Sequence, residues 1–425
     1  MSKTFYTYNL GCKVNAYELS AISSLLIAKG FKEDDRNPDV VIINTCSVTA
    51  TADQKSRQHI RKMQKMFPHA VIAVMGCYSQ GNYEFIRNEI KPTILLGTNH
   101  RKDVVTLIEK ALKEGGTYTN IDENTRDFTY EELGITSYSE NVRAFLKIQD
   151  GCNNFCTYCI VPYRRGKMRS RNKENVIKEA EYLVKQGYQE IVLSGIHVGG
   201  YGQDLKDCSF SSLVEELLNL PGLNSLRISS IEESEIDDKL INLIKDKDNL
   251  AKHLHIPLQA GSNHVLKLMN RKYTREQFIE KIKRIKSLMP DVMISGDVIV
   301  GFPQETEEDF LETYKLCEEC FDMLHVFPYS LRPGTVAARM DGQISPDCKK
   351  KRSKVLLDLS DQLYAKFANR FVGQEVTVLV EKYDDQKGVN IGHTSNYLSV
   401  EIPIKESKVE QYITIKLQKD MILSK

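Results

Sequence analysis

The sequence predicts an α/β protein built from an amino-terminal doubly wound parallel sheet, a central full or partial (β/α) barrel and a small carboxy-terminal antiparallel β-barrel. Short apolar strand patterns alternate with amphipathic helical patterns over the first 115 residues. The alternation restarts near residue 141 with a longer period and gives six more strand–helix units, which is typical of a barrel. After Phe371 the residues alternate with the two-residue period of half-buried strands.

Composition narrows the class of protein. The 425 residues include 58 Lys and Arg against 57 Asp and Glu, for a net charge of +1, so any nucleic-acid binding must use a local patch. The apolar and charged fractions exclude a disordered chain, a collagen and a coiled-coil rod. No apolar run is long enough to span a membrane, and the start lacks an apolar signal core, so we expect a cytoplasmic protein with no membrane partner.

The first unit is expected over residues 1–118. Its predicted strands cover residues 3–10, 40–45, 71–75 and 93–96, and its clearest helices cover 15–29 and 49–66. Asn15 followed by Glu18 has the pattern of a capping box at the start of the first helix. Residues 119–140 are expected to form a linker, because positions 121–140 hold six acids, one Arg and no helical period.

The second unit is expected over residues 141–367 and the third over 368–425. The barrel strands are predicted at 143–149, 190–193, 225–230, 253–258, 293–300 and 323–329, with helices at 175–186 and 275–289 among them. In the third unit, strands at 375–380, 397–404 and 412–417 are punctuated by Gly388, Gly392 and Asn396. This last unit holds seven Lys and eight acids after Phe371, a charge of −1 that disfavours phosphate binding.

The strongest local motif is C-x-x-x-C-x-x-C at Cys152, Cys156 and Cys159. It follows the first predicted barrel strand, at the end of a barrel where chemistry is found. Three thiolates can hold three irons of a 4Fe–4S cube and leave the fourth iron open to a ligand. Zinc is the alternative metal, although structural zinc needs a fourth ligand and His197 is remote in sequence. Three buried apolar cysteines remain the alternative without a metal.

A second set of cysteines is dispersed in the chain. Cys12, Cys46 and Cys77 each follow the carboxyl end of a predicted parallel strand in the first unit. Those strand ends share one crevice in a doubly wound sheet, so the three thiols should converge and could also hold a cluster with an open iron. Three independent core cysteines are the alternative.

The other four cysteines carry no predicted chemistry. Cys317 and Cys320 form a C-x-x-C near the far end of a helical pattern, whereas redox pairs sit at helix amino termini. Core packing is therefore the favoured role for this pair. Cys208 and Cys348 have no companions and receive no role.

At these motifs the chain resembles the radical S-adenosylmethionine superfamily, in which an aromatic residue, here Tyr158, precedes the last cysteine of the motif. The upstream cysteines narrow the resemblance to the methylthiotransferases, which carry a second cluster in an α/β domain and end in a small domain called TRAM. The resemblance covers nearly the whole chain, in the expected order. It implies two 4Fe–4S clusters, S-adenosylmethionine as methyl donor and radical source, and no side-chain acid or base as the catalytic group.

The segment Leu10–Glu18 resembles the branch that acts on N6-threonylcarbamoyladenosine next to the tRNA anticodon. The resemblance implies that a methylthio group is inserted at carbon 2 of that base. One S-adenosylmethionine would methylate a sulfur at the Cys12, Cys46 and Cys77 cluster, and a second would be cleaved at the other cluster to give the radical that abstracts hydrogen. The same chemistry on isopentenyladenosine or on a ribosomal-protein aspartate, and an RNA-binding protein with structural clusters, are the alternatives.

The resemblance also implies S-adenosylmethionine contacts near the ends of the barrel strands, where short family-like motifs recur. These contacts are Tyr158, Ser194, Gly195, Ser229, Gln259, Asp297 and Gly301.

Residues 164–173 hold six basic residues and no acid, which predicts a phosphate-binding rim beside the second cysteine set. The candidate RNA contacts are Arg164, Arg165, Lys167, Arg169 and Arg171. Tyr397 and Tyr412 could stack on bases or fill the small carboxy-terminal core. The expected partners are the tRNA anticodon stem-loop, an electron donor such as a flavodoxin or ferredoxin, and a sulfur donor, acting on a monomer.

Overall fold

The computed structural model describes residues 3–134 and 142–424. The amino-terminal sheet is parallel throughout, with strand order β2-β1-β3-β4-β5-β6. Its strands are β1 Thr4–Asn9, β2 Lys32–Glu33, β3 Val40–Thr45, β4 Val71–Gly76, β5 Ile94–Leu96 and β6 Tyr118–Asn120. Its helices are α1 Lys13–Ala28, α2 Ala50–Met66, α3 Cys77–Gly81, α4 Tyr83–Phe85 and α5 Val104–Glu114, with η1 Ile86–Ile90 and η2 Arg101–Asp103 between them.

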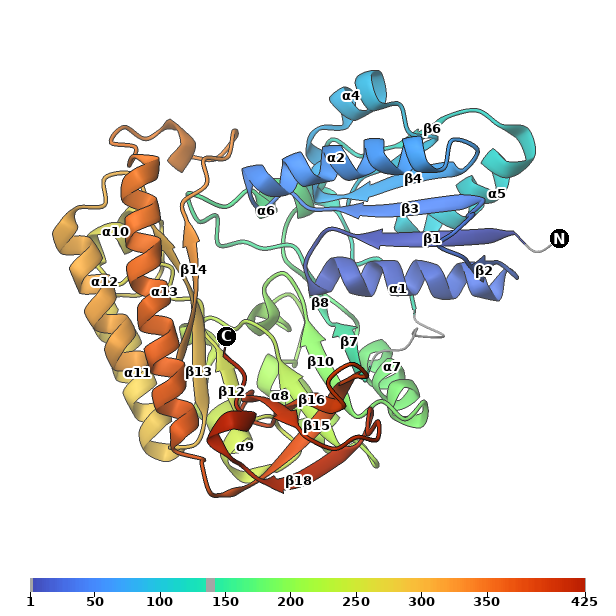
Figure 1. Ribbon diagram of the computed structural model, residues 1–425. Helices are drawn as coiled ribbons and strands as arrows, with labels where there is room; N and C mark the ends of the chain where they lie inside the picture. The colour runs from blue at the N-terminus through green and yellow to red at the C-terminus, as the bar shows by residue number, and fades with distance from the viewer. Residues whose placement is uncertain (1–2, 135–141, 425) are drawn as a thin grey trace.

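Helices cover both faces of this sheet, as Figure 1 shows for α2 on one side and α1 and α5 on the other. The alternation of side chains along β3 explains the two layers: Val40 and Ile42 pack with α1 and α5, whereas Val41 and Ile43 pack with α2. The doubly wound prediction is therefore confirmed for the described residues.

Two predictions for this region are wrong. Asn15 and Glu18 do not form a capping box, because α1 begins at Lys13 and both side chains are buried in polar contacts beneath the sheet edge. The boundary predicted after residue 118 falls inside β6, whose residues Tyr118–Asn120 extend the sheet by pairing with β5. The predicted linker continues through η3 Thr125–Asp127, and its last part, residues 135–140, lies outside the described residues.

The central unit is a partial parallel barrel. Its six strands are β7 Arg143–Lys147, β10 Glu190–Ser194, β11 Ser225–Ile228, β12 His253–His255, β13 Met293–Val300 and β14 Met323–Pro328. Two three-stranded ladders, β7-β10-β11 and β12-β13-β14, are joined by the bridges Leu226–Leu250 and Ser230–His255. A short antiparallel ribbon of β8 Gln149–Asp150 and β9 Arg169–Ser170 flanks the first strand.

The barrel helices enclose one apolar core. They are α6 Val161–Arg165, α7 Lys173–Lys185, α8 Phe210–Leu218, α9 Asp238–Asp246, α10 Asn263–Leu268, α11 Arg275–Leu288, α12 Glu307–Cys320 and α13 Pro346–Asn369, with η4 Val198–Gly200, η5 Glu233–Glu235 and η6 Ala337–Arg339 in the loops. Cys317 and Cys320 lie in this core, which confirms their predicted packing role. No described helix is both long enough and apolar enough to cross a lipid bilayer.

The carboxy-terminal unit is an antiparallel sheet with strand order β17-β16-β15-β18. The strands are β15 Glu375–Asp384, β16 Val389–Thr394, β17 Ser399–Ile402 and β18 Tyr412–Lys416, and η7 Lys419–Met421 follows them. Gly392 does not punctuate the strands but lies inside β16, where a Cβ atom would lie 2.1 Å from the Leu379 carbonyl oxygen.

This sheet docks on the amino ends of the barrel strands (Figure 1, bottom). Tyr397 stacks between His253 and His393, each with a ring-centroid distance of 4.7 Å, and the Arg227 guanidinium lies 4.9 Å from its ring centroid. The Tyr412 hydroxyl donates to the Gln189 carbonyl at 3.0 Å. Both tyrosines thus serve the contact between the two units, at the end of the barrel opposite to the cysteine motif.

Candidate active site

The amino-terminal cysteines meet at the carboxyl ends of three neighbouring strands of the parallel sheet. Cys12 follows β1, Cys46 follows β3 and Cys77 follows β4, and these three strands are neighbours in the sheet. Burial raises the pKa of the Cys46 thiol to about 11, and the negative charges of Cys77 and Cys12 add to the shift. The structure therefore brings together the three thiols that the sequence placed at one crevice.

A network of buried ion pairs lies next to these strand ends. It joins the amino-terminal sheet to the barrel. One oxygen of Glu18 accepts from Arg101, Lys147 and Arg165 at 2.6, 3.0 and 2.8 Å. Burial by itself would raise the pKa of Glu18, but the attraction of these three cations outweighs it and lowers the pKa well below its usual range. Asp150 is a second carboxylate shared by the same cations, with its pKa also held low.

The second cysteine set occupies the loop that follows β8. The backbone N–H of Asn154 donates to Cys152 Sγ at 3.4 Å, and Arg271 Nη1 donates to Cys156 Sγ at 3.5 Å. Burial raises the pKa of Cys159 to about 12, and the charges of Cys156 and Cys152 raise it further. Such buried thiols lose their protons when a metal replaces them, so a strongly bound cluster suits this loop.

Each of the two cysteine sets offers three sulfur donors. Among residues 3–134 and 142–424, no three Cys, His, Asp or Glu side chains form a site for one metal ion. Three sulfur donors from one set could hold three irons of a four-iron cube, and this assignment stays a prediction. Arg164 Nε and Ser194 Oγ are among the buried polar atoms of the described chain that lack a hydrogen-bond partner.

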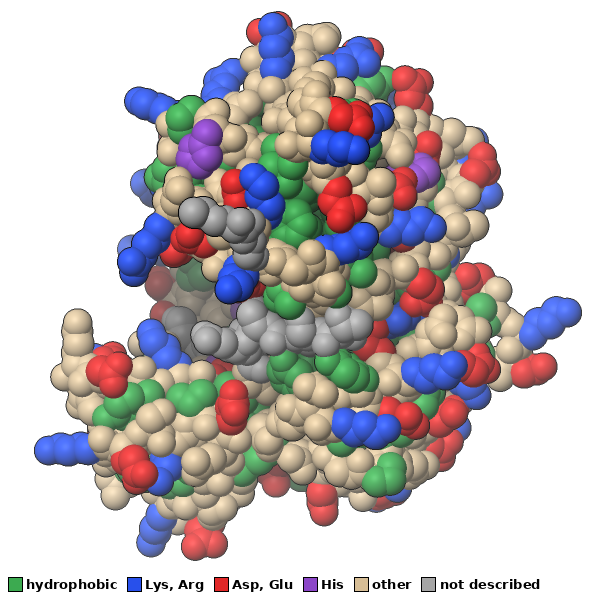
Figure 2. Space-filling model, turned by 90° about the vertical axis from the view of Figure 1, so that its right-hand side faces the viewer, with side chains coloured by type: hydrophobic (Ala, Val, Ile, Leu, Met, Phe, Trp, Pro, Cys, Tyr) green, Lys and Arg blue, Asp and Glu red, His purple; other side chains and the backbone are tan. Residues whose placement is uncertain are grey.

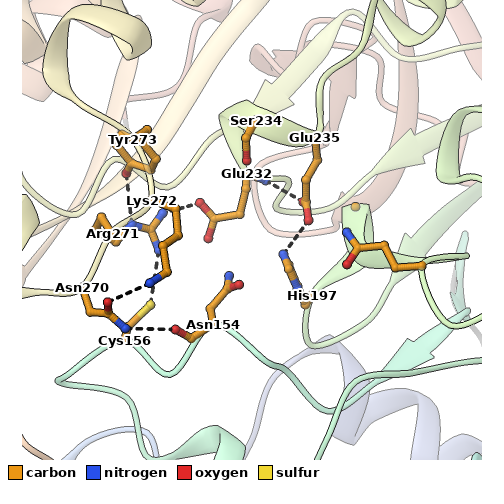
Figure 3. Close-up of a pocket in the computed structure, with 12 residues that line it drawn as sticks. Asn154, Cys156, His197, Glu232, Ser234, Glu235, Asn270, Arg271, Lys272 and Tyr273 are labelled. Carbon is orange, nitrogen blue, oxygen red and sulfur yellow. Dashed lines mark hydrogen bonds and ion pairs between the residues drawn. The ribbon is translucent and has the colours of Figure 1, made fainter.

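A polar cavity of about 310 Å³ adjoins the second cysteine set (Figure 3). Its walls carry both signs of charge, with Glu232 and Glu235 on one side and Arg271 and Lys272 on the other. Arg271 is buried and forms an ion pair with Glu232, which fixes its guanidinium between the cavity and Cys156. A cavity of this kind can bind a small zwitterion.

His197 also lines the cavity and lies near Cys152, although the two residues are remote in sequence. Burial would lower its pKa, but hydrogen bonding to Cys152 and to Glu235 raises the pKa to about 10. The Nε2 atom lies 2.6 Å from Glu235 Oε1. The Nε2 nitrogen of His197 is therefore paired with a carboxylate in the described structure.

The predicted S-adenosylmethionine contacts lie around this cavity but do not line it. Ser194 ends β10, Gly195 and Ser229 follow β10 and β11, and Gly301 follows β13. Asp297 faces His255 Nε2 at 3.2 Å. The others are Tyr158, whose ring packs edge-on against Phe302, and Gln259, whose backbone N–H donates to the Asp297 backbone carbonyl at 2.8 Å. Their contact with the cofactor stays a prediction.

The basic run is mostly internal, which corrects its predicted role. Arg165 and Arg169 pair with Asp150, and Arg171 pairs with Glu179 at 2.8 Å and Glu132. All three side chains are at most 7% exposed, so the prediction that they contact RNA phosphates is wrong. Of the five, only half-buried Arg164 and exposed Lys167 keep access to a ligand.

The face of the molecule in Figure 2 carries charges of both signs. Figure 2 shows Lys and Arg side chains interspersed with Asp and Glu on that face, with a hollow between the upper and lower parts of the molecule. Glu232, Glu235 and Arg271 could not be predicted from local sequence, because isolated charged residues on loops carry no local signal. Only the position of these residues after successive barrel strands could have identified them.

The chain matches known families and known proteins over most of its length. Residues 146–317 match the model described as the Radical SAM superfamily, and residues 4–97 match the uncharacterized protein family UPF0004. The chain is 43% identical, over 97% of its length and 93% of the relative's, to the threonylcarbamoyladenosine tRNA methylthiotransferase MtaB of Bacillus subtilis (strain 168). It is 38% identical, over 89% of its length and 82% of the relative's, to the tRNA-2-methylthio-N(6)-dimethylallyladenosine synthase of Thermoanaerobacter pseudethanolicus.

A solved structure shares the fold. The radical S-adenosylmethionine methyltransferase TsrM from Kitasatospora setae, with tryptophan and a cofactor analog bound, superposes with a TM-score of 0.58. The match covers 79% of this chain and 75% of that chain at 14% identity, so it shows a shared fold and nothing further. Matches over nearly the full length of relatives, together with two convergent cysteine sets on the expected folds, lead to one conclusion: the chain belongs to the radical S-adenosylmethionine methylthiotransferase family.

Proposed function

We propose that the protein inserts a methylthio group at carbon 2 of N6-threonylcarbamoyladenosine next to the tRNA anticodon. The observation that carries this proposal is the pairing of two three-cysteine sets with 43% identity to a threonylcarbamoyladenosine tRNA methylthiotransferase. Isopentenyladenosine in tRNA is the second candidate substrate, supported by the 38% identity to a dimethylallyladenosine-directed relative.

Two 4Fe–4S clusters are proposed, one held by Cys12, Cys46 and Cys77 and one by Cys152, Cys156 and Cys159. When bound, the clusters and S-adenosylmethionine supply the radical and sulfur-transfer chemistry of the family. An electron donor such as a flavodoxin or ferredoxin and a sulfur donor complete the reaction, and we propose that the enzyme acts as a cytoplasmic monomer.

The cavity beside Cys156 is proposed to bind the amino-acid part of S-adenosylmethionine. The buried Arg271 is held by Glu232 and by the Tyr273 hydroxyl, so its position is fixed before a ligand arrives. Opposite charges on the cavity walls can meet the carboxylate and ammonium groups of the cofactor. The protein's part in the chemistry is thus to orient the cofactor and limit its motion.

RNA phosphates are proposed to contact the amino-terminal half of α13. Lys350, Lys351 and Lys354 are exposed there, and none forms an ion pair within the described part of the chain. Two of these lysines border a groove of about 570 Å³ that also includes Pro328, the last residue of β14. The carboxyl end of β14 lies at the barrel end that carries the cysteines. The three lysines can therefore bind the stem of an RNA whose modified base enters the active site.

The first experiment measures iron and sulfide in protein reconstituted without oxygen, for the wild type and for two triple variants in which one cysteine set becomes alanine. We expect about eight irons in the wild type and about four in each triple variant. Cys208→Ala/Cys348→Ala is the matched control and should keep eight. Four irons in the wild type would refute the two-cluster arrangement.

The substrate is then identified by mass spectrometry of nucleosides from tRNA carrying either modified adenosine. Methylthiolation of the threonylcarbamoyl nucleoside alone supports the proposal. Product only from the isopentenyl nucleoside would favour the second candidate. Tight tRNA binding without any product in either substrate would favour the RNA-binding protein with structural clusters.

A further inference from the structure

Arg165 reaches from the barrel unit into the amino-terminal cysteine set. It ends α6, six residues beyond Cys159, yet its Nε donates to Cys77 Sγ at 3.2 Å, 88 positions away in sequence. Its other nitrogens are occupied, because Nη2 donates to Asn15 Oδ1 at 3.0 Å and Nη1 meets Glu18 and Asp150. The guanidinium therefore has one fixed orientation, aimed at the sulfur.

This guanidinium is permanently charged and fully buried. Its side chain has 0% relative exposure, as does that of Glu18. A positive charge that cannot be hydrated acts strongly on a sulfur 3.2 Å away.

Cys77 receives this bond from another unit of the fold, not from its own. Cys12 instead has a contact within its own helix, at 3.4 Å from Asn15 Oδ1. Asn15 accepts in turn from Arg165, so the guanidinium touches one cysteine directly and a second through an amide. The surroundings of these thiols are therefore complete only when the barrel is docked on the sheet.

We propose that Arg165 is a positioning residue that raises the reduction potential of the cluster held by Cys12, Cys46 and Cys77. The inference rests on the proposed function, since it needs that cysteine set to hold a cluster. Hydrogen bonds to ligand sulfurs, net charge and burial are what set the potential of an iron–sulfur cluster. Removal of a buried cation that donates to Cys77 stabilises the oxidised form and lowers the potential.

The test uses full-length protein in which Cys152, Cys156 and Cys159 are alanine, so that only the amino-terminal cluster remains. Iron content is measured first, and about four irons per chain must be present. Absence of iron at this stage refutes the two-cluster part of the proposed function, and the inference falls with it. With four irons present, the midpoint potential is read by electron paramagnetic resonance at a series of poised potentials.

Arg165→Gln is compared with Arg101→Gln in this background. Arg101 is an equally buried member of the same network. Within the described chain it pairs with Glu18, Glu131 and Asp150 and donates to no cysteine sulfur. We expect the potential of Arg165→Gln to fall clearly below that of Arg101→Gln. Equal potentials in the two variants overturn the proposal, because loss of network charge would then explain the whole effect.

Arg165→Lys covers the case in which the Gln variant loses its iron. Lysine keeps the charge but cannot reproduce the fixed Nε donor, so a potential below that of the background supports the proposal and an unchanged one overturns it. Loss of iron in both Arg165 variants, while Arg101→Gln keeps four, also overturns it in favour of a role in retaining the cluster.

Discussion

Glu18→Gln probes the network that joins the sheet to the barrel. The Glu18 carboxylate accepts five hydrogen bonds, three at Oε1 and two at Oε2. The two at Oε2 come from Asn44 Nδ2 at 3.1 Å and Arg165 Nη2 at 3.3 Å. In glutamine an NH₂ group takes the place of one oxygen, so at least two donors face another donor.

The expected cost follows from burial. Glu18 has 0% exposure, so water cannot replace the lost bonds, and breaking a buried pair by removing one partner costs about 3–5 kcal/mol. At an m-value of about 3 kcal/mol/M or more for a chain of this size, the first urea transition should move down by roughly 1 M. The chain has several units, so the first transition is compared and not a single two-state free energy.

Urea unfolding followed by circular dichroism, in the reconstituted protein without oxygen, measures this effect. Glu215→Gln is the control, since Glu215 pairs with Lys239 at 2.6 Å while both side chains are over 40% exposed. Such a surface pair contributes about 0–1 kcal/mol. If the two variants unfold at the same urea concentration, the buried network does not hold the two units together and the reasoning is refuted.

Three further variants test separate parts of the molecule. Changing the three exposed α13 lysines to alanine should weaken tRNA binding and reduce the slope of log affinity against log salt by about 2. Lys283→Ala is the control and should leave the slope unchanged, because Lys283 already forms a surface ion pair with Glu319. Arg271→Gln should weaken S-adenosylmethionine binding at least about tenfold by calorimetry, because the carboxylate of the cofactor then loses the guanidinium proposed to meet it. Unchanged affinity would show that the cofactor binds outside this cavity. Tyr397→Ala should lower the free energy of unfolding by about 2 kcal/mol and leave the iron content unchanged. Tyr397→Phe keeps the stacked ring and should lose less stability. Equal losses of stability in the two variants would contradict a stacking role.

The fold was predictable where one pattern dominates a segment. β3 and β13 occupy their predicted residues, Val40–Thr45 and Met293–Val300, because long apolar strands in a parallel sheet admit few alternatives. The two-residue strands β2, β8 and β9 were missed, since pairing with distant segments and not local sequence creates them.

The candidate active site was likewise predictable only where the local sequence carries the signal. Cys12, Cys46 and Cys77 lie after neighbouring strands, as the strand pattern predicts. The prediction for the basic run was wrong because charge balance is not local. Arg165 looks unopposed in sequence, but Glu18 lies 147 positions away and contacts it directly. Asp150 was visible next to the motif, but nothing in the sequence shows that it points inward.

The order of the chain gives the network between sheet and barrel a consequence for synthesis. All six strands of the amino-terminal sheet are available once residue 120 has been translated, but Lys147 and Arg165 follow later. The nascent sheet can therefore align its strands first, with only Arg101 opposite Glu18, and completes its charge balance after the barrel segment has left the ribosome. A fragment that ends near residue 120 is thus not a smaller copy of the same sheet. It lacks the guanidinium that meets Cys77, and any cluster assembled on it would report a different sulfur environment.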